Sequence, residues 1–349
     1  VSAEETASAV SVEAPEYVLM EPETGTVILE KDKDVPRSPA SVTKVMTLLL
    51  IFEEIEKGNL KLDDTVITSA HAKSMGGSQV FLEEGETQTV ETMIKCIVIA
   101  SGNDASVAMA EHIAGNEPEF VNAMNKKAQA LGMKNTHFVD CCGLTDSDDH
   151  YTTAYDIALM SRELIRKYPE ILNYSSVWMD TITHNTRQGS KEFGLSNTNR
   201  LIRTYEGCVG LKTGSTSKAK FCVSVVAKRK GITLIAVVMA APDSRTRVKD
   251  ASMLFDYGFA KCSLYTDENP GKLPDLKVIK GIKEKTTLTF GKTFRCLSTD
   301  GTTFDKIKKK LILPNEVKAP VKKGQKAGEL VYYQENRELG RIPVIYAEN

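Results

Sequence analysis

The sequence predicts an α+β domain followed by a small all-β domain. Strand-like segments stand at both ends of residues 1–263 with helical segments between them, and residues 264–349 hold only short strand-like runs separated by Pro and Gly turns. The chain of 349 residues is long enough for two domains, and its 41% hydrophobic and 26% charged residues are typical of a globular protein. We therefore expect one domain over residues 1–263 and a second over residues 264–349.

The first domain begins with a predicted β-hairpin. Two apolar runs in YVLMEPETGTVILEKD flank the turn residues Glu-Thr-Gly at 23–25. Later strand-like segments and a closing helix are expected at residues 209–212, 221–228, 232–240 and 243–260. The hairpin needs a partner for its apolar face, so we expect it to join the late strands in one antiparallel sheet.

Periodic apolar residues predict the helices between these strands. They are expected at residues 41–57, 90–100, 104–114, 117–131 and 153–167. Gly58 and Gly132 end two of these helices, and Thr153 begins the last one. Short extended pieces are expected at 64–68 and 79–82, whereas residues 168–205 read as irregular and polar. The helices would form a cluster that packs on the sheet.

The second domain differs from the first in its predicted secondary structure and in its charge. Its strand-like runs are LKVIKG, KTTLTF, KKLILP, AGELVYYQ and GRIPVIY, and residues 265–275 are the expected linker. Residues 264–349 hold 17 Lys and Arg against 11 Asp and Glu, whereas residues 1–263 hold 28 against 35. This difference in charge has two equally good interpretations: either both domains have ordinary surfaces, or the basic second domain faces an anionic envelope surface.

Several classes of function lack their usual sequence signals. No run of about 20 apolar residues predicts a membrane-spanning helix, and no Gly-rich phosphate loop or aromatic-basic stripe indicates nucleotide or nucleic-acid binding. The five histidines share no metal-ligand spacing, so we expect neither a metal nor another cofactor. The seven cysteines lack a C-x-x-C spacing and are expected to be free thiols, with Cys96 and Cys222 in the core.

The most informative motif lies where a long apolar helix begins. Ser41 and Lys44 stand three residues apart in SPASVTKVMTLLLIF, so they share one helix face. A hydroxyl beside an amine is a nucleophile beside a base, and the positive end of the helix dipole disfavours the ammonium form of that amine. The pair alone equally describes an ordinary solvated helix turn, so its meaning depends on the rest of the chain.

Two further motifs follow in order. Ser-Gly-Asn at 101–103 stands between two apolar helical runs, and Lys-Thr-Gly at 212–214 stands between two strand-like segments. An ordered set of S-x-x-K, S-D-N and K-T-G is typical of penicillin-binding proteins and class A β-lactamases. With S-G-N in the middle and the phrases SPASVTKVMT, ASGNDAS and GLKTGSTS, residues 16–259 resemble the low-molecular-weight penicillin-binding proteins, which are serine-type D-Ala-D-Ala carboxypeptidases of peptidase family S11.

The resemblance implies a fold, an activity and a location. The fold would be that of the penicillin-recognising serine hydrolases, with an antiparallel sheet, a helical cluster and a β-rich second domain. The activity would be release of the terminal D-Ala from a peptidoglycan stem pentapeptide, with β-lactam antibiotics as covalent inhibitors. Family members are usually exported and tethered by a C-terminal amphipathic helix, so we expect an extracytoplasmic protein on the outer face of the cytoplasmic membrane. The small, acidic residues 1–16 fit either a mature N-terminus after export or a trimmed chain.

The resemblance also implies three catalytic residues. Ser41 would be the nucleophile and Lys44 its base, and Ser101 would relay a proton to the leaving amine. An unperturbed lysine has a pKa of about 10.4, so Lys44 can act as a base near pH 7 only if burial or a second cation lowers its pKa. Lys212 is the expected second cation. The identity of the acylation base differs between accounts of these enzymes, so this division of labour stays a hypothesis.

The other motif residues would bind the substrate. Asn103 is expected to orient Lys44 or to hold the substrate amide, and Thr213 with Lys212 to bind the terminal carboxylate. Gly214 lacks a side chain, which would let a substrate pair with its strand as an added edge.

Backbone donors and one arginine complete the expected site. The N–H groups of Ser41 and Ser215 would form the oxyanion hole. In the family a basic residue beyond the last strand helps to bind the substrate carboxylate. Counting back from Tyr-Gly-Phe at 257–259 favours Arg247 over Arg245 for this role, and a solvated helix start is the competing interpretation.

The chain departs from the family pattern at two places. Many relatives carry Ala-Gly shortly after the third motif, where this chain has Ala219 followed by Lys220. Members often carry Pro-His-Gly-Leu where residues 141–144 read Cys-Cys-Gly-Leu here. We interpret the second difference as a packing or loop position that leaves the catalytic groups unchanged.

Two other functions fit parts of the pattern. A β-lactamase of class A deacylates through a water held by a glutamate, and no convincing E-x-x-L-N phrase stands between the second and third motifs. A non-catalytic protein that binds the cell wall is expected to carry a broken motif, and all three motifs are intact. The carboxypeptidase is therefore the function that the sequence favours.

Overall fold

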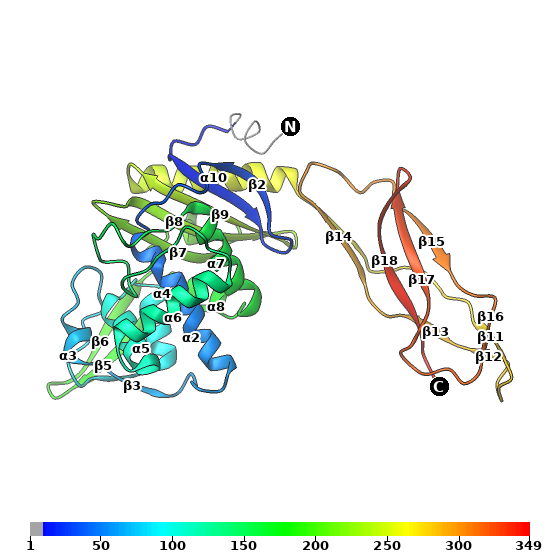
Figure 1. Ribbon diagram of the computed structural model, residues 1–349, viewed down its shortest axis with the longest axis horizontal. Helices are drawn as coiled ribbons and strands as arrows, with labels where there is room; N and C mark the ends of the chain where they lie inside the picture. Colours follow the sequence, from blue (N-terminus) through cyan, green and yellow to red (C-terminus); the bar gives the residue numbers. More distant parts are fainter. Residues whose placement is uncertain (1–9) are drawn as a thin grey trace. The chain divides into compact units, whose positions relative to one another are not determined.

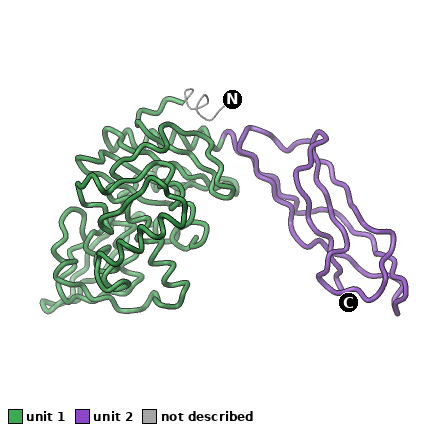
Figure 2. The backbone as a smooth tube through the Cα atoms, viewed as in Figure 1, with its two compact units in different colours: residues 1–259 green, residues 260–349 purple. Residues whose placement is uncertain are grey.

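The structure is a computed structural model that describes residues 10–349 (Figure 1). Residues 1–9, which hold most of the acidic N-terminal stretch, lie outside the described residues. The chain divides into two compact units, of which the first ends at Phe259 and the second spans Ala260–Asn349 (Figure 2).

A five-stranded antiparallel sheet forms the centre of the first unit, with the strand order β2-β1-β9-β8-β7. The strands are β1 (Glu16–Glu21), β2 (Thr26–Lys31), β7 (Cys208–Thr216), β8 (Lys220–Arg229) and β9 (Ile232–Ala241). The N-terminal hairpin pairs with the last of these strands, and Val18 lies opposite Val237. The predicted union of early and late strands is therefore confirmed.

The helices of the first unit are α2 (Lys44–Glu56), α3 (Ala70–Lys73), α4 (Val90–Val98), α5 (Asn103–Ala114), α6 (Glu117–Ala130), α7 (Ala154–Lys167), α8 (Ile171–Ser175), α9 (Leu201–Thr204) and α10 (Ser244–Lys261). In α2, every residue from Lys44 to Phe52 is buried, so this helix runs through the core. Helix α7 packs against β1 and β9, and α10 covers the opposite face of the sheet (Figure 1). The predicted α+β architecture with a helical cluster is confirmed.

Two parts of the first unit differ from the prediction. The extended piece expected at 64–68 is the short strand β3 (Thr65–Ile67), which pairs with β4 (Thr87–Thr89), a strand that the sequence did not predict. Residues 79–82 form a loop, in which the N–H groups of Val80 and Leu82 donate to the carboxylate of Asp104. The carboxylate of Asp104, at the start of α5, thus accepts the backbone hydrogen bonds that a neighbouring strand would otherwise accept.

The segment 168–205 is more regular than its polar sequence predicts. It contains α8, α9 and a hairpin of β5 (Met179–Thr186) and β6 (Gly189–Ser196). Both strands are largely exposed, so they lack the strict alternation of apolar and polar residues that marks a half-buried strand. The sequence pattern therefore does not predict this hairpin.

The second unit is all β, as predicted. Its strands are β10 (Ser263–Asp267), β11 (Leu276–Ile279), β12 (Lys285–Thr286), β13 (Leu288–Phe290), β14 (Phe294–Ser298), β15 (Lys308–Ile312), β16 (Glu316–Lys318), β17 (Lys326–Gln334) and β18 (Arg337–Tyr346). The core is small and centres on Tyr332, whose ring stacks on Phe294 at 3.8 Å between centroids. The Tyr332 hydroxyl donates to Asp267 Oδ2 at 2.7 Å, so the predicted linker over 265–275 is wrong at its start.

The structure also bears on the state of the cysteines and on the presence of a membrane-spanning helix. All seven cysteines are free thiols, and Cys96 and Cys222 are fully buried, as predicted. Among the helices of residues 10–349, none combines the length and hydrophobicity that crossing a bilayer requires.

Candidate active site

Ser41 lies on a single turn of 3-10 helix, η1 (Ala40–Thr43), directly before α2. The predicted helix therefore begins three residues later than expected, at Lys44. Ala40 has φ +49°, a left-handed conformation that turns the chain sharply into Ser41. Ser41 remains half-buried while Lys44 is fully buried, and Ser41 Oγ lies 2.9 Å from Lys44 Nζ. The structure therefore brings the predicted pair together.

The Lys44 amine is the point where three distant segments meet. Besides Ser41 Oγ, it contacts Asn103 Oδ1 at 2.6 Å, the backbone oxygen of Cys142 at 3.0 Å and Ser101 Oγ at 3.3 Å. Burial lowers the pKa of Lys44, because the ammonium form loses its hydration there. Nearby acidic groups work against this shift, and Asp140 and Asp104 are among them.

The partners of Lys44 suit the neutral amine as well as the ammonium. Asn103 Oδ1 and the Cys142 oxygen can only accept, so each takes one N–H bond. A neutral amine has two N–H groups, which these two oxygens accept from, and its lone pair stays free to accept the proton of Ser41. In the ammonium form the third N–H group would donate to the oxygen of Ser41. Proton transfer between Ser41 and Lys44 therefore leaves the other contacts in place.

The second motif is held by the backbone on both sides. Asn103 begins α5, its N–H donates to Ser78 O at 2.7 Å, and its Nδ2 donates to Gly76 O at 2.9 Å. These donor bonds fix which amide atom faces Lys44, namely the oxygen. Ser101 is buried and has φ +60°, a left-handed conformation that is uncommon for residues other than glycine.

The loop that supplies the Cys142 oxygen is fixed by Asp140. The Asp140 carboxylate accepts from the N–H groups of Cys142, Gly143 and Thr145 at 2.6–3.1 Å. The Cys142 thiol takes no part in the contact with Lys44, which is made by the backbone. The change from His to Cys relative to the family pattern therefore leaves this contact available.

Gly143 explains how closely this loop approaches the nucleophile turn. It has φ +80°, and a Cβ at this position would lie 1.7 Å from the backbone oxygen of Ala40 and 2.9 Å from Thr43 Oγ1. Only glycine fits between the two backbones. The sequence motif around 141–144 therefore contributes a glycine for packing and a carbonyl for Lys44.

The third motif lies on edge strand β7, beside the η1 turn. Lys212 is fully buried, and its Nζ donates to Thr213 O at 2.9 Å. Burial lowers the pKa of Lys212, and the charges of Lys44 and then Arg247 lower it further. Burial is the main cause of the lowered pKa of Lys44 as well. Repulsion between two ammonium groups acts on both of them, so the expected influence of Lys212 on Lys44 stays a prediction.

Gly214 has a steric role that the sequence analysis did not identify. A Cβ there would lie 2.7 Å from the backbone nitrogen of Ser41 and 2.9 Å from Pro39 O. Glycine thus lets β7 lie directly against the nucleophile turn. The next residue, Ser215, is exposed, and Arg247 is half-buried, with its Nη1 donating weakly to the oxygens of Gly214 and Cys222 at 3.4 and 3.3 Å.

Two neighbouring side chains escaped the sequence analysis. Thr198 Oγ1 lies 2.6 Å from Thr213 Oγ1, and the Thr198 N–H donates to Ile99 O at 3.2 Å, so this residue links the third motif to the segment before the second. His150 Nδ1 accepts from Val139 N, which leaves its Nε2 to donate to Thr43 Oγ1 at 2.8 Å. Neither lies in a recognisable motif, so only the tertiary structure identifies them.

No group of three or more His, Cys, Asp or Glu within residues 10–349 could hold a metal ion. The groups that the structure brings together are the hydroxyls of Ser41 and Ser101, the Asn103 amide and two buried lysines.

Comparison with known proteins assigns the chain to a family. A family profile described as D-alanyl-D-alanine carboxypeptidase matches residues 3–243, which is more than half of the chain. The chain belongs to this carboxypeptidase family. A second profile, the C-terminal domain of penicillin-binding protein 5, matches residues 267–349. The resemblance and the assignment to the serine-type carboxypeptidases are confirmed.

Individual carboxypeptidases resemble the chain over most of its length. D-alanyl-D-alanine carboxypeptidase DacF of Bacillus subtilis (strain 168) is 43% identical over 338 residues, which cover 97% of this chain and 86% of that protein. The structure of D-alanyl-D-alanine carboxypeptidase DacD from Francisella tularensis has a TM-score of 0.71 with 28% identity, over 97% of this chain and 94% of that one. The Streptomyces K15 DD-transpeptidase has a TM-score of 0.67 with 30% identity, over 72% of this chain and 98% of that one.

The close approach at Gly143 can be tested by stability. Gly143→Ala is expected to lower the free energy of unfolding by about 2–4 kcal/mol, because the new Cβ overlaps the Ala40 carbonyl and φ is positive. The matched control is Gly132→Ala, at φ +76° with open space around it, which should cost about 1 kcal/mol. Urea unfolding of both variants decides, and equal losses would mean that the two backbones do not meet.

Proposed function

We propose that this carboxypeptidase removes the terminal D-Ala from peptidoglycan stem pentapeptides through an ester on Ser41. The observation that carries the proposal is the buried Lys44 amine within 2.9 Å of Ser41 Oγ. Burial lowers the pKa of this amine, so a larger share of it is neutral and able to act as a base at a given pH. The Ser41 hydroxyl is its nearest proton source.

The proposed acylation moves one proton and exchanges one bond. Ser41 Oγ loses its proton to Lys44 and bonds to the carbonyl carbon of the penultimate D-Ala. The bond from that carbon to the nitrogen of the last D-Ala then breaks, and the leaving nitrogen takes a proton through Ser101, which lies 3.3 Å from Lys44 Nζ. Water then attacks the ester, which releases the shortened peptide and restores the Ser41 hydroxyl. Two easier steps replace one amide hydrolysis.

The oxyanion hole is assigned to the backbone N–H groups of Ser41 and Ser215. Gly214 supports this assignment, because it lies against the Ser41 nitrogen and precedes Ser215 directly. The two N–H groups therefore belong to segments in contact, one at η1 and one on β7. Removing one such donor typically costs about 2.7–4 kcal/mol of transition-state stabilisation in other hydrolases.

Binding of the terminal carboxylate is assigned to Thr213, with positive charge from Arg247 and from Lys212, whose lowered pKa a bound carboxylate would raise again. Arg247 is held over the ring of Phe221 at 5.4 Å and toward the oxygen of Gly214, which brings its guanidinium to the end of the third motif. Thr198 orients Thr213, because a threonine that donates to a carboxylate is best satisfied by accepting from a second hydroxyl.

Acylation by β-lactams follows from the same chemistry, because their strained amide presents a carbonyl to Ser41 in the same way. The products of the reaction distinguish the carboxypeptidase from the two alternative functions. A β-lactamase would turn over penicillin rapidly without releasing D-Ala, and a non-catalytic wall-binding protein would do neither. Peptidoglycan lies outside the cytoplasmic membrane, so the proposed substrate implies an extracytoplasmic location.

The nucleophile is tested by Ser41→Ala with two readouts. Release of D-Ala from a synthetic pentapeptide should fall by at least about 10⁴-fold, and a labelled penicillin should no longer attach. Ser252→Ala is the matched control, because Ser252 donates only to Val248 O within α10, and both readouts should stay at the wild-type level. Attachment of penicillin to Ser41→Ala, or rapid penicillin turnover by the wild type without D-Ala release, would refute the proposal.

The role of Thr198 is tested by replacing its hydroxyl. Thr198→Val should lower kcat/KM for the pentapeptide about tenfold, equivalent to about 1.4 kcal/mol for one hydrogen bond, mainly through KM. Thr198→Ser keeps the hydroxyl and should recover most of this loss. If the valine and serine variants lose activity equally, Thr198 acts by packing and not through Thr213.

A further inference from the structure

Phe81 is an aromatic residue that the first unit holds in solvent. It is 60% exposed, whereas Val80 and Leu82 on either side of it are buried. Its φ of +61° lies in the left-handed region, which is strained for a residue with a bulky side chain. A single exposed aromatic residue is ordinary, but one kept in a strained backbone conformation points to a role outside its own packing.

The backbone around Phe81 is fixed by the start of α5. The N–H groups of Val80 and Leu82 donate to the carboxylate of Asp104, which is 1% exposed, at 3.0–3.2 Å. Asn103, one residue earlier in α5, donates to two backbone oxygens of the same segment at 2.7 and 2.9 Å. The ring of Phe81 therefore projects from a segment that is bonded directly to the second motif.

The ring of Phe81 has a partner on the β5–β6 hairpin. It packs edge-on against Phe193 of β6, with 5.8 Å between the ring centroids. Phe193 is in turn edge-on to His184 of β5 at 5.6 Å, and His184 Nδ1 lies 2.6 Å from Glu86 Oε2. The hairpin is thus joined at two points to the segment that carries Phe81. We name the two rings, Phe81 and Phe193, the aromatic ledge.

The same hairpin leads to the third motif. Two residues after β6 ends, the hydroxyl of Thr198 lies 2.6 Å from the hydroxyl of Thr213. The two elements that meet at the aromatic ledge are therefore bonded to the second motif and to the third motif. This makes the ledge continuous with the candidate active site.

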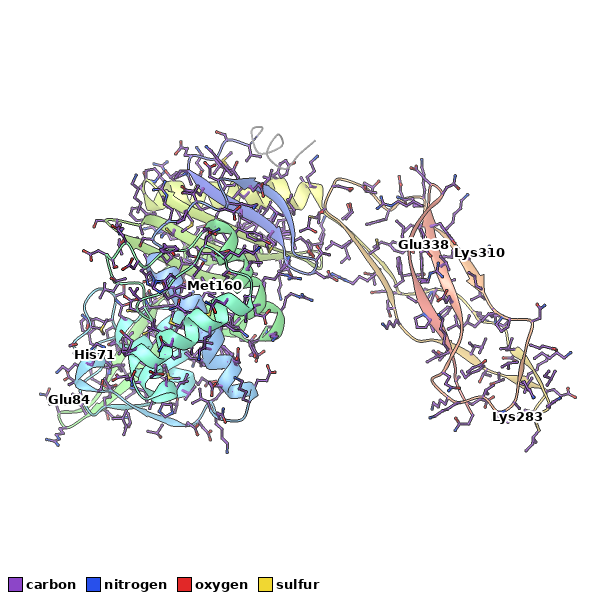
Figure 3. All side chains as sticks on the ribbon, in the orientation of Figure 1. His71, Glu84, Met160, Lys283, Lys310 and Glu338 are labelled. Carbon is purple, nitrogen blue, oxygen red and sulfur yellow. The ribbon has the colours of Figure 1, made fainter. Side chains whose placement is uncertain are left out.

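The ledge is the apolar part of a surface that is otherwise polar. Past Phe81, the segment and the hairpin turn enclose a hollow of about 700 Å³, which is lined by residues 83–86 and 185–188. Glu84, one of three glutamates in this lining, is labelled in Figure 3. Apart from a glycine, all the lining residues are polar or charged. An apolar group of a ligand would therefore find its contact at the ledge and not in this hollow.

The proposed substrate approaches the ledge with its acyl side. Its terminal carboxylate is assigned to Thr213 and Arg247, and its scissile carbonyl to Ser41. One N–H of the Asn103 amide donates to a backbone oxygen, and the other is suited to the carbonyl of the residue that precedes the two D-Ala residues. That residue would then lie beside the segment that carries Phe81.

We propose that the aromatic ledge binds the side chain of the residue that precedes D-Ala-D-Ala in the substrate. The matching chemistry is a long side chain with methylene groups, such as that of a diamino acid, which packs on the exposed part of the Phe81 ring. Because the backbone of Phe81 is already fixed, little conformational entropy is lost when the substrate binds. The inference rests on the proposed function and adds to it a preference at the third residue of the stem.

Two synthetic substrates separate this contact from the chemistry. An acetylated L-Lys-D-Ala-D-Ala peptide has a long side chain before the two D-Ala residues, and acetyl-Gly-D-Ala-D-Ala has none. Phe81→Ala should lower kcat/KM for the lysine substrate about tenfold, the effect of exposing one or two methylene groups, mainly by raising KM. For the glycine substrate the loss should stay below about twofold. Release of D-Ala measures both.

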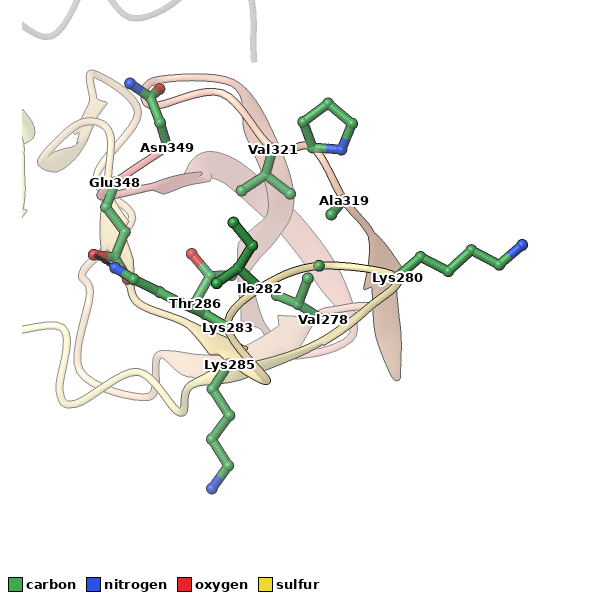
Figure 4. Close-up of a pocket in the computed structure, with 12 residues that line it drawn as sticks. Val278, Lys280, Ile282, Lys283, Lys285, Thr286, Ala319, Val321, Glu348 and Asn349 are labelled. Atoms are coloured by element: carbon green, nitrogen blue, oxygen red, sulfur yellow. Dashed lines mark hydrogen bonds and ion pairs between the residues drawn. The ribbon is translucent and has the colours of Figure 1, made fainter.

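Three further variants identify a merely structural effect. Phe81→Tyr keeps the ring and should match the wild type on both substrates. Phe81→Gly relieves the left-handed strain, so it should unfold at a higher urea concentration than Phe81→Ala and still lose the same activity on the lysine substrate. Ile282→Ala removes a fully exposed apolar side chain from a hollow of the second unit (Figure 4) and should change neither substrate.

The results that would overturn the inference differ from those that would refute the proposed function. Unchanged kcat/KM of Phe81→Ala on the lysine substrate would show that the ledge does not contact the substrate. Equal losses on the two substrates, or recovered activity in the more stable Phe81→Gly, would show that Phe81 only supports Asn103. A wild type that releases D-Ala from neither substrate would refute the proposed function and this inference with it.

Discussion

The rest of the first unit depends on keeping the Lys44 amine buried and still hydrogen-bonded. Removing an ammonium from water costs several kcal/mol unless acceptors replace its hydration. The chain meets this cost with acceptors from Ser41, Asn103 and the Cys142 backbone, which come from three separated segments. Because two of these groups can only accept, they hold the amine in place in either protonation state. The result is a lysine that stays in position while its pKa is lowered.

Backbone contacts, more than side chains, bring these segments together. Gly143 lies against the carbonyl of Ala40, and Gly214 lies against the nitrogen of Ser41, so neither position has room for a Cβ. The nucleophile turn is thus enclosed between the Asp140 loop and strand β7. A carbonyl serves as the fourth contact of the lysine, which makes that contact insensitive to whether residue 142 is His or Cys.

Sequence reasoning could predict what is local and could not predict what the tertiary structure creates. The Ser41–Lys44 pair follows from helical spacing, and the union of the first hairpin with β9 follows from the need to bury apolar strands. The role of the Cys142 backbone oxygen cannot be predicted from the sequence, because every residue has a carbonyl. Thr198 lies just after a hairpin whose two exposed strands lack apolar alternation. The burial that lowers the pKa values of Lys44 and Lys212 is likewise encoded by no motif.

The central claim, that neutral Lys44 takes the proton of Ser41, is tested most directly by the pH dependence of acylation by a labelled penicillin. The wild-type rate should rise as the pH rises through the lowered pKa of Lys44 and level off below about 10.4, the unperturbed value. Lys44→Arg should lose about 10²–10⁴-fold at every pH, because arginine is not deprotonated in proteins. Lys57→Arg, at the exposed end of the same helix, should match the wild type. A Lys44→Arg variant that acylates at the wild-type rate would contradict the account.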